Sequence, residues 1–165
     1  MTARAEDPAS FTIRHAAAAD AHAVHECLSL AFAPYRDQYT TGAFADTVIT
    51  LAAVRTRLDA MRLFVAQDPQ GTVIGTIGYS MIDAVEGHIR GLAVRPDAQG
   101  CGVASRLLAA AEADMLDRGA ARITLDTTRP LERAMQLYER RGYRRSGVTR
   151  DFFGMPLVEY VKPLG

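Results

Sequence analysis

The most constraining feature of the sequence is a glycine-containing segment that joins an expected strand to an expected helix. The apolar residues of the strand end at Val94, a proline turn follows, and Gly100 and Gly102 stand just before a helical pattern that starts near Val103. Glycine accepts backbone conformations that bring amide groups close to a ligand, and the first turn of a helix adds unpaired N–H donors and the positive end of the helix dipole. The segment therefore predicts a site where backbone amides bind a phosphate or another oxyanion.

Two familiar phosphate-binding loops do not fit this segment. A Walker loop has Lys followed by Ser or Thr directly after its second glycine, and this pair is not present after Gly102. A dinucleotide-binding loop favours a third glycine where Ser105 stands, and an acidic residue about twenty positions further on, where Arg122 and Ile123 stand.

The segment resembles instead the cofactor loop of the GCN5-related N-acetyltransferase family, which reads Gln or Arg, x, x, Gly, x, Gly or Ala. Here the pattern is Gln99-x-x-Gly102-x-Ala104, directly after the expected strand. The resemblance implies that two strands splay apart around the pantetheine arm of acetyl-coenzyme A (acetyl-CoA), and that the loop amides hold its pyrophosphate. The cofactor-binding residues it implies are Leu92, Ala93, Val94, Gln99, Gly100, Cys101, Gly102, Val103, Ala104 and Ser105.

A second motif follows in the expected order and at the expected separation. The segment Ala134-x-x-Leu137-Tyr138-x-x-x-Gly142-Tyr143 is similar to the family's Ala-x-x-Leu-Tyr-x-x-x-Gly-Phe. Two motifs in the correct order are much more specific than either motif alone. The chain departs from the family pattern at Leu131, where an Asn that hydrogen-bonds the pantetheine or thioester region often stands.

Tyr138 has two interpretations. It lies on the apolar stripe of its expected helix, which fits a core residue. The resemblance implies that it is the general acid that protonates the departing thiolate. A phenol with a pKa near 10 and a thiol with a pKa near 8.5 are close enough for this proton transfer, and an inward ring with its hydroxyl at the gap in the sheet satisfies both interpretations.

The general base has three candidates. Glu86, His88 and Arg90 alternate onto one face of the expected strand over residues 86–94. Family members often carry Glu at the position of His88, and a neutral imidazole can accept a proton from an ammonium through water. His88 is the first candidate, Glu86 is the second, and a water chain is the third.

Aromatic residues in two segments are expected to line the pocket for the acceptor amine. They are Tyr35 and Tyr39, with Arg36 and Asp37 between them, and Phe152 with Phe153, and the polar residues of the first segment are expected to line the pocket as well. These residues do not choose among a peptide N-terminus, a lysine, a polyamine, an amino acid and an antibiotic amine.

Alternating strand and helix patterns, without repeats or a low-complexity linker, predict an α/β fold with a single-domain mixed twisted sheet flanked by helices. The resemblance implies an acyl-CoA N-acyltransferase fold. We expect a flexible N-terminal segment over residues 1–10 and an N-acetyltransferase domain over residues 11–165. In detail, we expect a helix capped by Asp20, one helix over residues 44–58, a type I turn over residues 68–71, and a helix with Pro130 at its first position.

Composition narrows the possible partners and compartment. Nineteen basic and nineteen acidic residues give a net charge of zero, which argues against nucleic-acid and membrane-surface binding. Residues 1–8 carry no apolar signal core, so we expect a cytoplasmic protein. The two cysteines, Cys27 and Cys101, are expected to be free thiols, and the Cys and His spacings predict no metal site.

The sequence thus predicts an enzyme that transfers acetyl from acetyl-CoA to a primary amine, on a small molecule or a peptide, by direct attack in a ternary complex. The protein is expected to be a monomer or a homodimer. The alternative is an acyl-CoA-binding sensor or interaction module with little catalysis.

Overall fold

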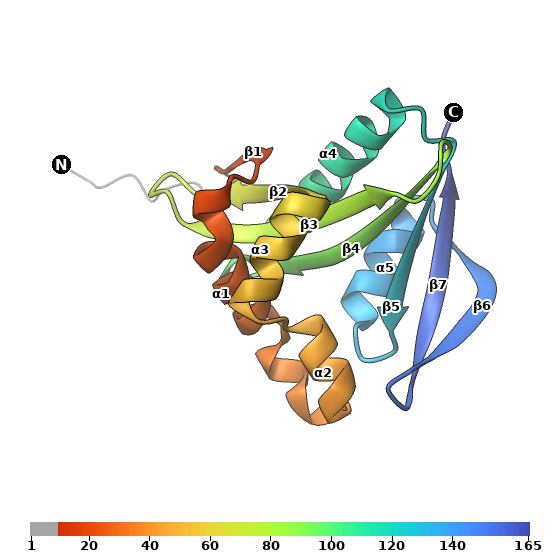
Figure 1. Cartoon of the computed structure of the whole chain (residues 1–165), viewed down its shortest axis with the longest axis horizontal. Coiled ribbons are helices and arrows are strands. Elements are labelled where there is room, and N and C mark those ends of the chain that lie inside the picture. The colour runs from red at the N-terminus through yellow and green to blue at the C-terminus, as the bar shows by residue number, and fades with distance from the viewer. Residues whose placement is uncertain (1–9) are drawn as a thin grey trace.

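The computed structural model describes residues 10–165, which form a seven-stranded sheet with helices on both faces (Figure 1). The strand order is β1-β2-β3-β4-β5-β7-β6, and only β4 and β5 are parallel neighbours. The strands are β1 (Thr12–His15), β2 (Arg62–Gln67), β3 (Val73–Met81), β4 (Glu86–Val94), β5 (Arg122–Thr128), β6 (Arg144–Phe152) and β7 (Met155–Pro163). The predicted mixed α/β sheet is confirmed, whereas residues 1–9 of the expected N-terminal segment lie outside the described residues.

The helices divide between the two faces of the sheet. Helices α1 (Ala21–Phe32) and α3 (Leu51–Ala60) cover one face, and α4 (Val103–Asp117) and α5 (Glu132–Arg140) cover the other (Figure 1). Helix α2 (Thr41–Thr47) precedes α3 and lies near the end of β5. Three short 3-10 segments complete the elements: η1 (Ala18–Asp20), η2 (Ala33–Gln38) and η3 (Pro96–Ala98).

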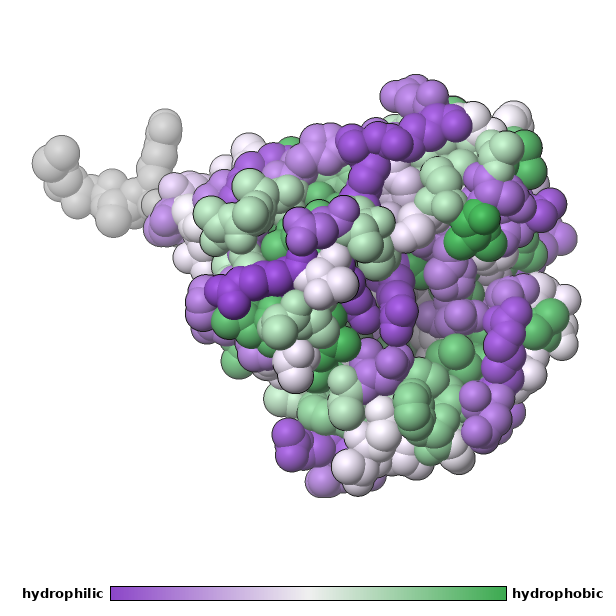
Figure 2. Space-filling view, viewed as in Figure 1, coloured by the Kyte–Doolittle hydropathy of each residue, from purple (hydrophilic) through white to green (hydrophobic). Residues whose placement is uncertain are grey.

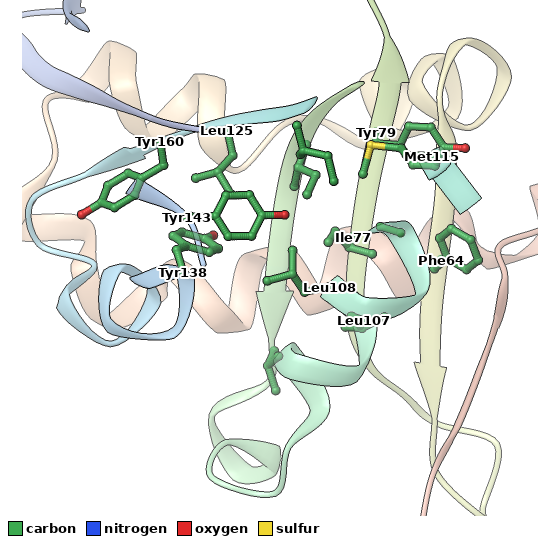
Figure 3. Packing of buried hydrophobic residues seen from close by; sticks show 14 of the residues in the cluster. Phe64, Ile77, Tyr79, Leu107, Leu108, Met115, Leu125, Tyr138, Tyr143 and Tyr160 are labelled. Carbon is green, nitrogen blue, oxygen red and sulfur yellow. The ribbon is translucent and has the colours of Figure 1, made fainter. Parts of the chain in front are cut away.

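Each face of the sheet has its own cluster of buried apolar side chains. Leu108, Ala111 and Met115 of α4 recur at helical spacing and are fully buried. Figure 3 shows Leu107 and Leu108 between two groups, with Phe64, Ile77 and Tyr79 on one side and Leu125, Tyr138, Tyr143 and Tyr160 on the other. The second cluster joins α1 and α3 to the opposite face through residues such as Val24, Val54 and Val65. The sheet is therefore held rigidly from both sides.

The single helix expected over residues 44–58 is wrong, because two helices occupy this region. Thr40 accepts a hydrogen bond from the amide of Ala43 at 3.2 Å and starts α2. Thr50 accepts one from the amide of Ala53 at 3.2 Å and starts α3. A threonine side chain that binds an amide three residues later is a strong helix-start signal, so Thr50 divides the apolar pattern into two elements.

Two of the expected helix starts also differ in detail. Asp20 directly precedes α1 but does not cap it, because its carboxylate is held by Arg14 at 2.8 and 2.9 Å and by the amide of Ala17 at 2.7 Å. Pro130 lies in a turn, and α5 begins two residues later at Glu132.

The type I turn between β2 and β3 fits the structure, since the amide of Gly71 donates to the carbonyl of Asp68 at 3.0 Å.

Strands β4 and β5 pair over only part of their length. Their register runs from Glu86 opposite Arg122 to Ile89 opposite Leu125, and beyond this point the strands diverge (Figure 1). Gly91, with φ of +74°, lies where the pairing of β4 with β3 shifts register. A bulge of this kind bends the strand and increases its twist. Within the described residues, the second half of β4 consequently has no strand partner on its β5 side.

Candidate functional site

Two cavities meet where β4 and β5 diverge. The first, which we call the loop cavity, has a volume of about 340 Å³ and lies between the end of β4, the glycine segment and α5. The second, the polar cavity, has a volume of about 350 Å³ and lies among β4, the end of β5, α2 and α3. Both volumes suit small ligands. The residues that line both cavities are Phe32, Leu92, Leu131 and Tyr138.

The glycine segment exposes its backbone to the loop cavity. Gly100 and Gly102 both have φ of +81°, and a Cβ atom at either position would meet nothing within 4 Å. Gly102 is also the N-cap residue of α4, a helix of 15 residues, so the amides of the first turn are directed to the same place. Nine of the ten expected cofactor-binding residues line this cavity, and Cys101 does not. The geometry fits an oxyanion bound by backbone amides.

Two arginines that the sequence did not single out belong to this region. Arg133 and Arg140 of α5 line the loop cavity and bring positive charge to it. Arg133 also donates to the side chain of Gln99 at 3.2 Å, and Gln99 in turn donates to the carbonyl of Val94 at 3.2 Å. Gln99 therefore links the glycine segment to both β4 and α5, a role that depends on contacts distant in the sequence.

Tyr138 belongs to both the core and the site. Its side chain packs against Tyr143 and Tyr160, with ring centroids 5.8 and 6.1 Å away (Figure 3). Only 6% of the residue is exposed, and burial raises the pKa of its phenol well above the ordinary tyrosine value. Within the described residues its hydroxyl makes no hydrogen bond, and the residue lines both cavities. Tyr138 is thus a protonated phenol, free of protein partners, at the junction.

His88 lies in the polar cavity together with a carboxylate from β5. Its Nδ1 is 2.8 Å from Oγ1 of Thr124, and its Nε2 is 3.5 Å from Oδ2 of Asp126. Burial raises the pKa of Asp126, while the charges of His88 and Arg150 act in the opposite direction. The sequence alone did not identify Asp126 as a site residue. Its closeness to His88 depends on the parallel register of β4 and β5, which places Thr124 opposite His88.

Glu86, the second candidate base, is not brought to either cavity. It lies at the start of β4, two residues before His88, and forms a close ion pair with Arg122 at the start of β5. Its side chain faces the paired half of the two strands rather than the half that diverges.

The aromatic residues expected around the acceptor divide between the two cavities. Tyr35 lines the loop cavity, whereas Tyr39 and Phe152 line the polar cavity. The Tyr39 hydroxyl is 2.5 Å from Oγ1 of Thr128, which ties η2 to the end of β5. Phe153, which is 57% exposed, lines neither cavity.

Arg36 and Asp37 also line neither cavity, and the Arg36 guanidinium lies 4.8 Å from the centre of the Phe44 ring.

Within residues 10–165, no group of three or more His, Cys, Asp or Glu side chains is arranged to hold a metal ion. No helix there has both the length and the apolar character needed to cross a membrane. Both cysteines are free thiols, with Cys27 buried and Cys101 half-buried.

Solved structures share this fold across nearly the whole chain. PaiA N-acetyltransferase from Thermoplasma acidophilum, in complex with coenzyme A, matches with a TM-score of 0.80 at 17% identity, covering 94% of this chain and 99% of its own. Ribosomal-protein-S18-alanine N-acetyltransferase from Escherichia coli matches with a TM-score of 0.76 at 18% identity, covering 94% and 95%. An acetyltransferase of the GNAT family from Staphylococcus aureus Mu50 matches with a TM-score of 0.76 at 16% identity, covering 94% and 100%.

At these identities the structural matches establish only the fold, so the family assignment rests on the sequence. The sequence model of the acetyltransferase (GNAT) family matches residues 23–143, which is most of the chain. The expected acyl-CoA N-acyltransferase fold is confirmed by the structural matches. The protein belongs to the acetyltransferase (GNAT) family.

Proposed function

We propose that residues 11–165 form a domain that transfers acetyl from acetyl-CoA to a primary amine, with both substrates bound at once. Family membership supports acyl transfer as the reaction class. The observation that supports a ternary complex is that the two cavities adjoin, because Leu92 and Tyr138 line both of them. A donor held in the loop cavity and an amine held in the polar cavity would meet at this junction, and such positioning lowers the entropic part of the barrier.

The loop cavity fits acetyl-CoA on chemical grounds. The amides at Gly100, Gly102 and the first turn of α4 suit the pyrophosphate, and Arg133 and Arg140 add charges suited to phosphate oxygens. The second half of β4 offers backbone groups to the amides of the pantetheine arm, because β5 does not pair with them. When bound, acetyl-CoA supplies a thioester carbonyl carbon for the amine to attack and leaves as the free thiol.

We propose that Tyr138 donates its phenolic proton to the departing sulfur. Burial raises the pKa of Tyr138, so the phenol holds its proton across the pH range of activity. The same buried surroundings disfavour an unprotonated thiolate, so the donor and acceptor of this proton stay close in pKa. The tyrosines packed around the ring keep its hydroxyl at the junction.

We propose that His88 receives the proton of the amine, with Asp126 beside it. If Nδ1 donates to Thr124, Nε2 keeps its lone pair on the side of Asp126. The carboxylate of Asp126 stabilises the imidazolium that forms. Because burial raises the pKa of Asp126, its negative charge, and with it this support for the imidazolium, is lost at a higher pH than that of an ordinary aspartate.

The proposal is tested by thiol release from acetyl-CoA with a panel of amines that contains amino acids, polyamines, peptides and antibiotic amines. We expect thiol release that depends on an amine, with equal formation of the N-acetyl product. The acyl-CoA-binding sensor makes the opposite prediction, in which acetyl-CoA binds tightly and no member of the panel releases thiol.

We predict that Gly102→Val weakens acetyl-CoA binding by at least tenfold, about 1.4 kcal/mol. A branched side chain would fill the space beside the backbone that the pyrophosphate needs. The matched control is Gly147→Val on β6, because Gly147 has φ of +91°, also has nothing within 4 Å of an added Cβ atom, and lies outside both cavities. Both variants carry similar backbone strain, so calorimetry should find lost affinity in Gly102→Val alone. Equal affinity in the two variants would remove the glycine segment from the cofactor site.

We predict that Tyr138→Phe lowers turnover by roughly 10²- to 10⁴-fold, as the loss of a general acid does, while acetyl-CoA affinity changes only a few-fold. The matched control is Tyr143→Phe, because Tyr143 is 1% exposed, belongs to the same cluster and lines neither cavity. Steady-state kinetics and thermal unfolding of both variants separate the roles. A loss of stability with near-normal turnover in Tyr138→Phe would establish a purely structural tyrosine.

We predict that His88→Gln removes most turnover near pH 7 and recovers partly at higher pH, where more of the amine is already neutral. Asp126→Asn should keep more activity than His88→Gln, because the base remains and only the carboxylate beside it is lost. Rate profiles with one amine and saturating acetyl-CoA test both expectations. Full turnover in His88→Gln would exclude this base, and a selective loss in Glu86→Gln would assign the base to Glu86.

A further inference from the structure

The polar cavity contains a cation that the proposed transfer chemistry does not use. Apart from the tyrosines Tyr39 and Tyr138, the ionisable side chains that line this cavity are Asp46, Arg57, His88, Arg90 and Asp126. Arg90 donates to Asp46 at 3.1 Å, and Asp126 lies 3.4 Å from Arg150 and 3.5 Å from His88. Arg57 differs from these residues, because its guanidinium forms no hydrogen bond or ion pair anywhere in residues 10–165.

Arg57 is held where an unpaired charge is unfavourable. Helix α3 places it over β4, and a Cβ atom at Gly91 would lie only 3.2 Å from its Nη1. Burial and the neighbouring Arg90 lower the pKa of Arg57 to about 10, and Asp46 opposes them only in part. A partly buried charge without a partner raises the free energy of the unliganded protein. An anion that enters the cavity and pairs with Arg57 would remove this penalty, which favours binding of the anion.

The surroundings favour a carboxylate over a phosphate as this anion. A guanidinium presents a planar pair of donors that suits either group. However, Asp46 and Asp126 are each paired with an arginine, Arg90 and Arg150, so the unpaired charge in the cavity is the single charge of Arg57. A singly charged carboxylate neutralises this charge, whereas a doubly charged phosphate would leave an excess negative charge beside the two carboxylates.

We propose that the acceptor amine carries its own carboxylate, that Arg57 binds this carboxylate, and that the acceptor is therefore a small amino acid or a close relative of one. The inference rests on the proposed function, because it takes the polar cavity as the place of the amine. Its ammonium end would lie at His88 and Asp126, and its carboxylate end would lie near Gly91, three residues further along β4. At about 3.3 Å per residue along a strand, these ends are roughly 10 Å apart along the backbone, and His88 and Arg57 both line the cavity.

The shape of the molecule agrees with a small, polar acceptor. Figure 2 shows a hollow near the centre of this face, with hydrophilic side chains gathered around it, between the surface of α2 and α3 and the surface of β5, β6 and β7. The cavity volume of about 350 Å³ suits a small molecule.

The test compares acceptors that differ only in the carboxylate. Free α-amino acids and straight-chain ω-amino acids of increasing length are each paired with their amides, and rates are measured with saturating acetyl-CoA. We expect kcat/KM to be at least tenfold higher for the acid than for the amide, mainly through a lower KM. This comparison uses the unaltered protein and does not depend on whether a variant folds. Peptides with free C-termini are tested as a further set of acceptors. A higher kcat/KM for peptides than for free amino acids would contradict the proposal that the acceptor is a small amino acid.

Variants then assign the effect to Arg57. Arg57→Met should lower kcat/KM at least tenfold for the acids and leave the amides within about twofold, whereas Arg57→Lys should restore part of the loss. The matched control is Arg55→Met, because Arg55 lies on the same helix, is exposed and lines neither cavity. It should change neither class of acceptor.

A binding measurement separates this inference from the proposed function. Calorimetry of amino acids and their amides with the CoA-saturated protein should detect binding of the acids that Arg57→Met weakens. If no amine releases thiol but this binding is present, the transferase proposal fails and the carboxylate site stands. If acids and amides react equally and Arg57→Met changes neither, the carboxylate proposal is overturned and the transferase proposal stands.

Discussion

Both cavities exist because β4 and β5 stop pairing halfway along their length. Their parallel ladder ends at Ile89, and the bulge at Gly91 bends β4 away before the next pair forms. Each forgone ladder hydrogen bond costs about 0.5–1.5 kcal/mol when water or a ligand replaces it poorly. The two core clusters on opposite faces of the sheet are large enough to hold the strands in this open arrangement. Closing the ladder would remove the junction at Leu92 and Tyr138 where the two cavities meet.

The same packing that stabilises the fold positions the groups at the junction. Tyr138 is buried among Tyr143 and Tyr160, and its hydroxyl still has no protein partner in the described part of the chain. Gln99 fixes the glycine segment through Val94 and Arg133. A site built on rigid elements loses little entropy when it binds, so the core contributes directly to the positioning that the proposed acetyl transfer requires.

Local features of the site could be predicted from the sequence, and features that depend on strand register could not. Gly100 and Gly102 act through their own backbone and the helix that follows, so the sequence was sufficient to predict them. Asp126 comes close to His88 only because β4 and β5 are in a particular parallel register. Arg57 reaches the polar cavity only because α3 is separate from α2, and Thr50, which divides them, was missed as a helix start.

We propose that the unpaired half of β4 and the glycine segment together bind acetyl-CoA. Amide hydrogen exchange, measured residue by residue with and without acetyl-CoA, tests this most directly, because exchange reports whether each backbone N–H has a partner. We predict slower exchange on binding for residues 100–104 and for those amides of residues 91–94 that point away from β3, with little change at residues 86–89, which already pair with β5. Protection confined to other parts of the chain, or no protection of the amides in residues 91–94 that point away from β3, would contradict acetyl-CoA binding at this site.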